Sequence, residues 1–172
     1  MAIGKITERI DAITGIDEER RVAAPPCPKA VKIELTARCN FKCSFCATAY
    51  KLRDKADMDW GFYVKLLADL RRSGVEEIGV FYLGESFILD WLPDAIRAAK
   101  DEGFPYVFIT TNGSLAKPKM VKACMEAGLN SMKFSLNYAD EQQFSEIAGV
   151  KPSIYGDIID NIKTTVQVRD EG

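Results

Sequence analysis

Residues 31–46 read VKIELTARCNFKCSFC, a β-favouring run followed by a loop with three cysteines. The run from Val31 to Thr36 is rich in β-branched and apolar side chains, which favours a buried strand. Cys39, Cys43 and Cys46 lie too close together in sequence for an ordinary disulfide framework. This stretch therefore favours a metal site at the end of a strand.

Three further β-favouring runs lie at residues 77–83, 106–110 and 131–136, with helical patterns between and after them. Parallel strands need a crossover connection, which a helix supplies. A complete eight-unit barrel takes about 250 residues, whereas this chain has 172. We therefore predict an α/β fold, a partial (β/α) barrel of parallel strands with outer helices and about four visible βα units of the kind that build full barrels.

Each predicted helix has one apolar face. Cys124 falls on such a face, and core packing explains it without a ligand. The expected faces are Phe62, Tyr63, Leu66, Leu67 and Leu70; Leu92, Ala95, Ile96 and Ala99; Met120, Val121, Cys124 and Ala127; and Ile154, Ile158, Ile162 and Val166.

The chain divides into a lead-in and a core. Residues 1–28 are predicted to form a helix with Ile6, Ile10 and Ile13 on one face, followed by an extended segment rich in proline. Residues 29–172 are predicted to form the incomplete barrel.

The composition excludes several classes of function. The chain has no histidine, which removes Ser-His-Asp triads, Cys-His pairs and histidine zinc sites. The net charge of -2 gives no basic excess, so we do not expect nucleic-acid binding; the short apolar stretches predict no membrane partner. No apolar stretch approaches the ~20 residues of a membrane span, and no signal pattern is present, which predicts a cytoplasmic protein.

Polar residues follow every predicted strand. In parallel α/β proteins the active site lies beyond the carboxyl ends of the strands. Here those ends are residues 36–46, 83–86, 110–113 and 135–137. Strand ends are also polar simply because loops are solvated, and for all but the first this alternative stays open. Glu34, inside the first strand, is expected either at the solvated rim or in the barrel lumen, facing Lys133 or substrate.

Thiolates suit both iron–sulfur clusters and zinc. Structural zinc requires four protein ligands, and Cys27 is the candidate for the fourth, although it precedes the first strand. Three-cysteine ligation of a cubic cluster instead leaves one iron open to an exogenous ligand.

The stretch from Cys39 to Cys46, with Phe45 before the last cysteine, resembles the cluster loop of the radical S-adenosylmethionine (radical SAM) enzymes. Gly84-Glu85 resembles the end of the Gly-Gly-Glu motif of that family, and Thr111-Asn112-Gly113 resembles its third-strand terminus. The pattern of strand ends looks most like the branch of peptide-modifying enzymes with auxiliary clusters, the SPASM branch.

Two residues depart from the family pattern: Leu83 stands where the motif often has its first Gly, and Ser86 where many relatives have Pro. The family core has six strand–helix units, so a C-terminal domain or a partner chain is expected to close the barrel.

The resemblance implies that Cys39, Cys43 and Cys46 bind three irons of a [4Fe-4S] cluster, while SAM chelates the fourth. It also assigns residues to SAM: Phe45 near the adenine, Gly84 and Glu85 at the methionyl ammonium, Thr111 and Asn112 at the third strand end, and Ser135 and Asn137 at the ribose.

The function implied by the resemblance is that of a radical SAM enzyme. Such an enzyme takes one electron from an external reductant and cleaves SAM to a 5′-deoxyadenosyl radical, which abstracts hydrogen from an organic substrate, for which a peptide is one candidate. Two alternatives stay open: a non-catalytic iron–sulfur or zinc module for assembly or electron transfer, and the cluster-binding part of a longer catalyst.

Overall fold

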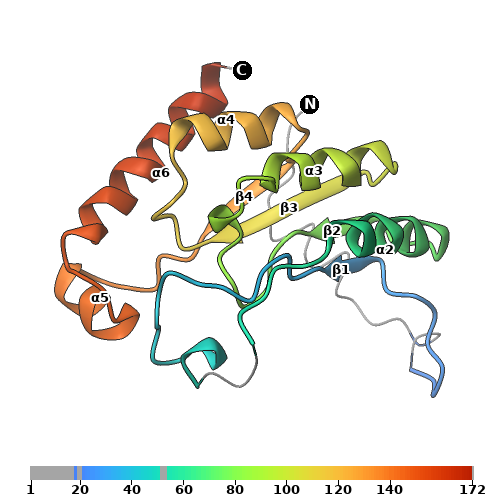
Figure 1. The fold of residues 1–172 in the computed structure, drawn as a ribbon, viewed down its shortest axis with the longest axis horizontal. Coiled ribbons are helices and arrows are strands. Elements are labelled where there is room, and N and C mark those ends of the chain that lie inside the picture. The colour runs from blue at the N-terminus through green and yellow to red at the C-terminus, as the bar shows by residue number, and fades with distance from the viewer. Residues whose placement is uncertain (1–17, 19–20, 51–53, 172) are drawn as a thin grey trace.

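A computed structural model of the chain describes residue 18 and residues 21–50 and 54–171 (Figure 1). Within these residues four strands form one parallel sheet in the order β1-β2-β3-β4. The strands are β1 (Ala30–Lys32), β2 (Glu77–Gly79), β3 (Tyr106–Thr111) and β4 (Ser131–Phe134). The predicted parallel α/β fold is therefore confirmed, although β1, β2 and β4 are shorter than the β-favouring runs.

The helices of the described residues follow the strands. Figure 1 shows α6 running beside α4, with α5 at the end of α6 that lies near the loop after β1. The α-helices are α2 (Trp60–Arg72), α3 (Leu92–Asp101), α4 (Pro118–Glu126), α5 (Glu141–Ala148) and α6 (Ile154–Glu171), and the short 3-10 turns are η2 (Ala47–Tyr50) and η3 (Ser86–Ile88).

Two apolar clusters hold these elements together. The main core lies between the sheet and α2, α3 and α4, where the predicted face of α3 is fully buried. The second, which we call the α5 cluster, consists of Phe41, Phe144, Ala148 and Ile158 and joins the loop after β1 to α5 and α6. The α5 cluster thus attaches residues 36–46, which we call the cysteine loop, to the C-terminal helices.

The predicted apolar face of α2 is wrong at one position. Asp59 caps the helix by accepting from the backbone N–H of Phe62, so the helix begins at Trp60. Tyr63 and Leu67, four residues apart, form the buried face, and Phe62 lies about 100° away around the helix. Phe62 is therefore 57% exposed.

The buried face of α6 also differs from the predicted apolar face, because it is rotated around the helix axis. Its buried residues are Ile158, Asn161 and Thr165, and the next residue, Val166, is 41% exposed. Packing of α6 against α4 and the loop after β3 decides this face.

Helix α5 was not predicted. Only its two ends carry a sequence signal. Asp140 caps the start by accepting from the backbone N–H of Gln143 at 2.8 Å, and Gly149 ends the helix with a left-handed φ of 66°. The expected helix around Ile6, Ile10 and Ile13 lies outside the described residues, and the division between residues 28 and 29 stays a prediction. Among the helices described here, none has the length and apolar character needed to span a membrane.

Candidate functional site

The cysteine loop is closed at its base by contacts to Asp57. Thr36 Oγ1 donates to Asp57 Oδ1 at 2.7 Å, while Arg38 binds both carboxylate oxygens, Nε to Oδ1 at 2.8 Å and Nη2 to Oδ2 at 2.6 Å. The hydrogen bond from Arg38 lowers the pKa of Asp57, and the bond from Thr36 and the Arg38 charge add to this effect. These bonds fix the backbone next to Cys39.

A second set of contacts holds the middle of the loop against α5. The backbone N–H groups of Lys42 and Ser44 donate to the carbonyl oxygens of Ala148 and Ile147, each at 2.9 Å. These bonds flank Cys43 on both sides, so its backbone is clamped to the C-terminal end of α5.

The three cysteines are half-buried, and their thiols make different contacts. Cys43 Sγ lies 3.5 Å from the Tyr138 hydroxyl, and Cys46 Sγ lies 3.1 Å from Thr48 Oγ1. Burial raises the pKa of the Cys39 thiol. A backbone hydrogen bond from Phe41 opposes this shift, whereas negative charge on Glu85 and on the other two cysteines adds to it.

Within the described residues, no three or more His, Cys, Asp or Glu side chains are grouped to hold a metal ion. The structure thus places Cys39, Cys43 and Cys46 in one clamped loop without gathering their sulfurs, and their role as ligands stays a prediction. Cys27 packs against the main core, whereas Cys39 and Cys43 pack against the α5 cluster.

Glu85 joins the ends of β2 and β3. Its side chain is 3% exposed; Oε1 accepts from Thr111 Oγ1 at 2.8 Å and from the Phe87 N–H at 3.1 Å, and Oε2 accepts from the Asn112 N–H at 2.8 Å. Burial raises the pKa of Glu85, and these three hydrogen bonds oppose that shift. The predicted site residues at two strand ends are therefore brought together.

Gly84 packs directly against the first strand end. A Cβ atom at this position would lie 1.9 Å from the carbonyl oxygen of Thr36 and 2.9 Å from that of Arg38. Glu34 Oε1 accepts from the N–H groups of Leu83 and Gly84 at 2.9 and 3.0 Å. The half-buried carboxylate of Glu34, two residues beyond the end of β1, thus binds the backbone of the segment after β2.

A network of amide and hydroxyl groups links β3 to the cysteine loop. Asn112 Nδ2 donates to Asn40 Oδ1 at 2.9 Å, Asn40 Nδ2 donates to Ser114 Oγ at 2.8 Å, and Ser114 Oγ donates to Asn112 Oδ1 at 2.7 Å. Asn161 of α6 supports this network by donating to the carbonyl oxygens of Gly113 and Ser114 at 2.8 and 3.2 Å.

Asn40, Ser114 and Asn161 were not predicted as site residues. The signal for Asn161 was available, because an asparagine between Ile158 and Ile162 on a buried helix face requires hydrogen-bond partners. Asn40 follows Cys39 directly in sequence, but its partner could not be predicted.

The remaining predicted residues follow β1 and β4 in the chain. Phe45 is 63% exposed. Ser135 donates its backbone N–H to the carbonyl oxygen of Thr111 at 2.8 Å, and Asn137 is exposed.

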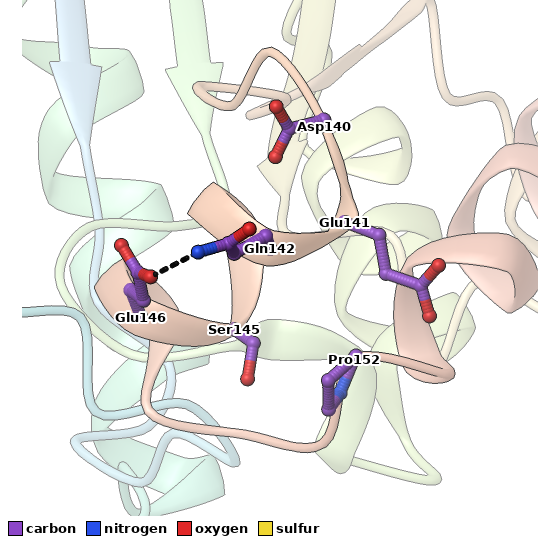
Figure 2. A pocket seen from close by; sticks show the side chains of 6 residues that line it. All are labelled: Asp140, Glu141, Gln142, Ser145, Glu146 and Pro152. Atoms are coloured by element: carbon purple, nitrogen blue, oxygen red, sulfur yellow. Dashed lines mark hydrogen bonds between the residues drawn. The ribbon is translucent and has the colours of Figure 1, made fainter.

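A separate open pocket lies over α5, and none of the predicted site residues lines it (Figure 2). Several of its polar side chains make local bonds: Gln142 donates to Glu146 at 3.0 Å, Asp140 accepts from the Gln143 N–H, and Ser145 donates to the carbonyl oxygen of Val150 at 2.8 Å. The lining residues are Asp140, Glu141, Gln142, Ser145, Glu146 and Pro152.

The family profile described as Radical SAM superfamily matches residues 33–169, well over half of the chain. The chain belongs to the radical SAM superfamily. The resemblance inferred from the cysteine loop is thereby confirmed. Membership in the radical SAM superfamily implies a [4Fe-4S] cluster and SAM; the SPASM branch stays a prediction.

Two curated relatives extend the comparison. The radical SAM chain is 28% identical over 146 residues to the tungsten-containing aldehyde ferredoxin oxidoreductase cofactor-modifying protein of Pyrococcus furiosus, covering 83% of this chain and 40% of that protein. It is 34% identical over 118 residues to GTP 3',8-cyclase of Chlorobaculum tepidum, covering 68% of this chain and 35% of that protein. The chain thus spans well under half the length of both relatives.

A solved structure supports the fold. The FeFe-hydrogenase maturase HydG from Carboxydothermus hydrogenoformans superposes with a TM-score of 0.67 over 81% of this chain and 33% of that chain, at 14% identity.

The donor chemistry of the cysteine loop fits the implied cluster. Three thiols lie on one loop whose backbone is held at its base and at α5, and soft sulfur ligands are those that iron–sulfur clusters use. The chain has no histidine to complete a four-ligand zinc site, and Cys27 lies in the other apolar cluster.

Proposed function

We propose that this chain is the cluster- and SAM-binding core of a radical SAM enzyme acting on an organic substrate. The observation that carries the proposal is the 2.9 Å hydrogen bond from Asn112 to Asn40. It joins the strand ends with the predicted SAM residues to the loop with the three cysteines.

The proposed ligands of the cluster are Cys39, Cys43 and Cys46. When bound and reduced, a [4Fe-4S] cluster supplies the electron that cleaves the SAM sulfonium to methionine and a 5′-deoxyadenosyl radical, which abstracts hydrogen from the substrate. The chain positions these groups and excludes water and stray hydrogen donors.

The residues proposed for SAM contribute in different ways. Glu85 accepts from three protein donors, two at Oε1 and one at Oε2, so Oε2 keeps a lone pair for a contact to the methionyl ammonium. Its bonds meanwhile hold the backbone at Phe87 and Asn112 in place. The exposed ring of Phe45 is accessible for stacking with an adenine. For Gly84, Thr111, Ser135 and Asn137, the proposal rests on their place at the strand ends.

The substrate class rests on the comparisons and on the motifs. The name of one relative describes a cofactor-modifying protein and that of the other a GTP cyclase. These names favour an organic substrate. A peptide stays the finer prediction from the motifs, and the electron is proposed to come from an external one-electron reductant.

The location of Cys27 distinguishes the proposal from a structural zinc module. A closed zinc site requires a fourth protein ligand, and Cys27 packs against the main core rather than with Cys39 and Cys43. We therefore place the non-catalytic module second.

The test is anaerobic reconstitution of the chain with iron and sulfide. We expect the absorbance of a [4Fe-4S] cluster, an EPR signal that changes on addition of SAM, and 5′-deoxyadenosine under reducing conditions. A colourless protein that holds one tightly bound zinc ion would contradict the proposal.

Two cysteine variants sharpen this test. Cys43→Ala is expected to abolish cluster retention. Cys124→Ala is the matched control, because Cys124 is fully buried in α4 and burial raises the pKa of its thiol to about 12. Equal loss of iron in both variants would count against the assignment of the cysteine loop.

A further inference from the structure

The contact between Cys43 and Tyr138 joins the cysteine loop to the segment after β4. Cys43 Sγ and the Tyr138 hydroxyl lie 3.5 Å apart, within the range of a hydrogen bond to sulfur, and the two residues are 95 positions apart in sequence. The contact is therefore a product of the tertiary fold.

The same helix holds both partners. The Tyr138 ring packs edge-on against Phe144 of α5 at a centroid distance of 5.0 Å. The backbone on either side of Cys43 is bonded to the last carbonyl groups of α5, at Ile147 and Ala148. Tyr138 and Cys43 are thus held against one rigid element.

Ligation of iron decides the direction of this hydrogen bond. A cysteine that ligates a metal is a thiolate and has no proton to donate. The Tyr138 O–H is then the donor and the Cys43 sulfur the acceptor. The bond borders the apolar α5 cluster, where a low local dielectric strengthens it.

We propose that Tyr138 is a positioning residue whose hydroxyl donates a hydrogen bond to the Cys43 sulfur and raises the reduction potential of the iron–sulfur cluster. This inference rests on the proposed function. Reduction adds one electron, and thus one negative charge, to the cluster and its thiolates. A donor O–H directed at a sulfur stabilises the more negative state, so hydrogen bonds to the ligand sulfurs raise the potential. No proton is transferred in this step.

The variant Tyr138→Phe tests the proposal because it removes the hydroxyl and keeps the ring against Phe144. Tyr155→Phe is the matched control. Tyr155 also packs on Phe144, at 5.7 Å, and within the part of the chain that the structure describes no bond between its hydroxyl and a cysteine is found.

The measurement is a redox titration of the reconstituted proteins, followed by the EPR signal of the reduced cluster, together with iron and sulfide content. In Tyr138→Phe we expect full cluster content and a more negative midpoint potential. At the wild-type midpoint, the ratio of reduced to oxidised cluster should fall about threefold or more. Tyr155→Phe should titrate as the wild type.

Three results would contradict the inference in distinguishable ways. Equal potentials in all three loaded proteins would overturn the role of Tyr138 and leave the proposed function intact. Loss of the cluster from Tyr138→Phe alone would overturn potential tuning, because the hydroxyl would then be needed for assembly. Absence of a cluster from the wild type would overturn the proposed function itself.

Discussion

Gly84 lies so close to the carbonyl oxygen of Thr36 that a Cβ atom at position 84 would stand 1.9 Å from it. The next backbone N–H, that of Glu85, donates to the carbonyl oxygen of Arg38 at 2.9 Å. The segment after β2 therefore runs directly along the start of the cysteine loop, and only a residue without a side chain fits there.

Gly84→Ala is expected to destabilise the fold by about 3 kcal/mol or more, because backbone atoms on both sides must separate. Gly156→Ala is the control: it lies in α6, a Cβ there meets nothing within 4 Å, and alanine favours a helix. Urea unfolding measures both. An unfolding free energy of Gly84→Ala equal to that of the wild type would contradict the close packing of Gly84 on Thr36.

The bond between Arg38 and Asp57 predicts a pH dependence. The pKa of the Asp57 carboxyl is lower in the folded than in the unfolded chain. The contact thus stabilises the fold above the unfolded pKa of about 4 and is lost as pH falls through the lower folded value. Asp57→Asn should therefore be less stable than the wild type at pH 7, by a small amount because the pair is exposed, and the difference should shrink towards pH 3. Urea unfolding at several pH values tests this; a constant difference would argue against the ion pair.

Glu85→Gln replaces one carboxylate oxygen by an amide NH2 that cannot accept from Thr111, Asn112 or Phe87. A buried donor is then left without a partner, which costs about 1–3 kcal/mol. Glu102→Gln, at an exposed position after α3, should change stability by less than about 0.5 kcal/mol. Thermal or urea unfolding of the two variants makes the comparison. Equal stability of Glu85→Gln and Glu102→Gln would show that Glu85 is not the buried acceptor described.

Two adjacent threonines of α6 provide a stabilising substitution and its matched control. Thr165 Oγ1 is buried and has no hydrogen-bond partner among the described residues, whereas Thr164 Oγ1 donates to the carbonyl oxygen of Asp160 at 2.7 Å. Thr165→Val should therefore stabilise the fold by about 1 kcal/mol. Thr164→Val should give no gain, and the helix propensities of Thr and Val are similar enough to cancel. The prediction fails if unfolding experiments give the two variants the same change.

Local patterns were sufficient to predict the sheet and the proximity of three polar residues at two of its strand ends. The carboxyl ends of parallel strands meet at one edge, so polar residues after separate strands were expected to lie together. Glu85, Thr111 and Asn112 do so within hydrogen-bond distance. The spacing of Cys39, Cys43 and Cys46 was sufficient to suggest the family because all three cysteines lie in one loop.

Partners far apart in sequence leave no such pattern. Asn40 and Asn112, like Cys43 and Tyr138, meet only through the tertiary fold. Helix α5 was missed because residues 141–148 are largely polar and only one side of the helix packs on the α5 cluster. Glu34 was expected either at the solvated rim or in the lumen facing Lys133 or substrate. Its bonds to the backbone amides of Leu83 and Gly84 were not predicted, because side-chain patterns do not encode them.

The bonds from Lys42 and Ser44 to the end of α5 have a consequence for biosynthesis. The cysteine loop is synthesised before Ile147 and Ala148, whose carbonyl groups hold the backbone on both sides of Cys43. Contacts of such long sequence separation form only after the intervening chain has been made. Until α5 has been made, the loop therefore lacks the two bonds that flank Cys43 and is held through Asp57, Glu85 and Asn112, which precede α5 in the chain.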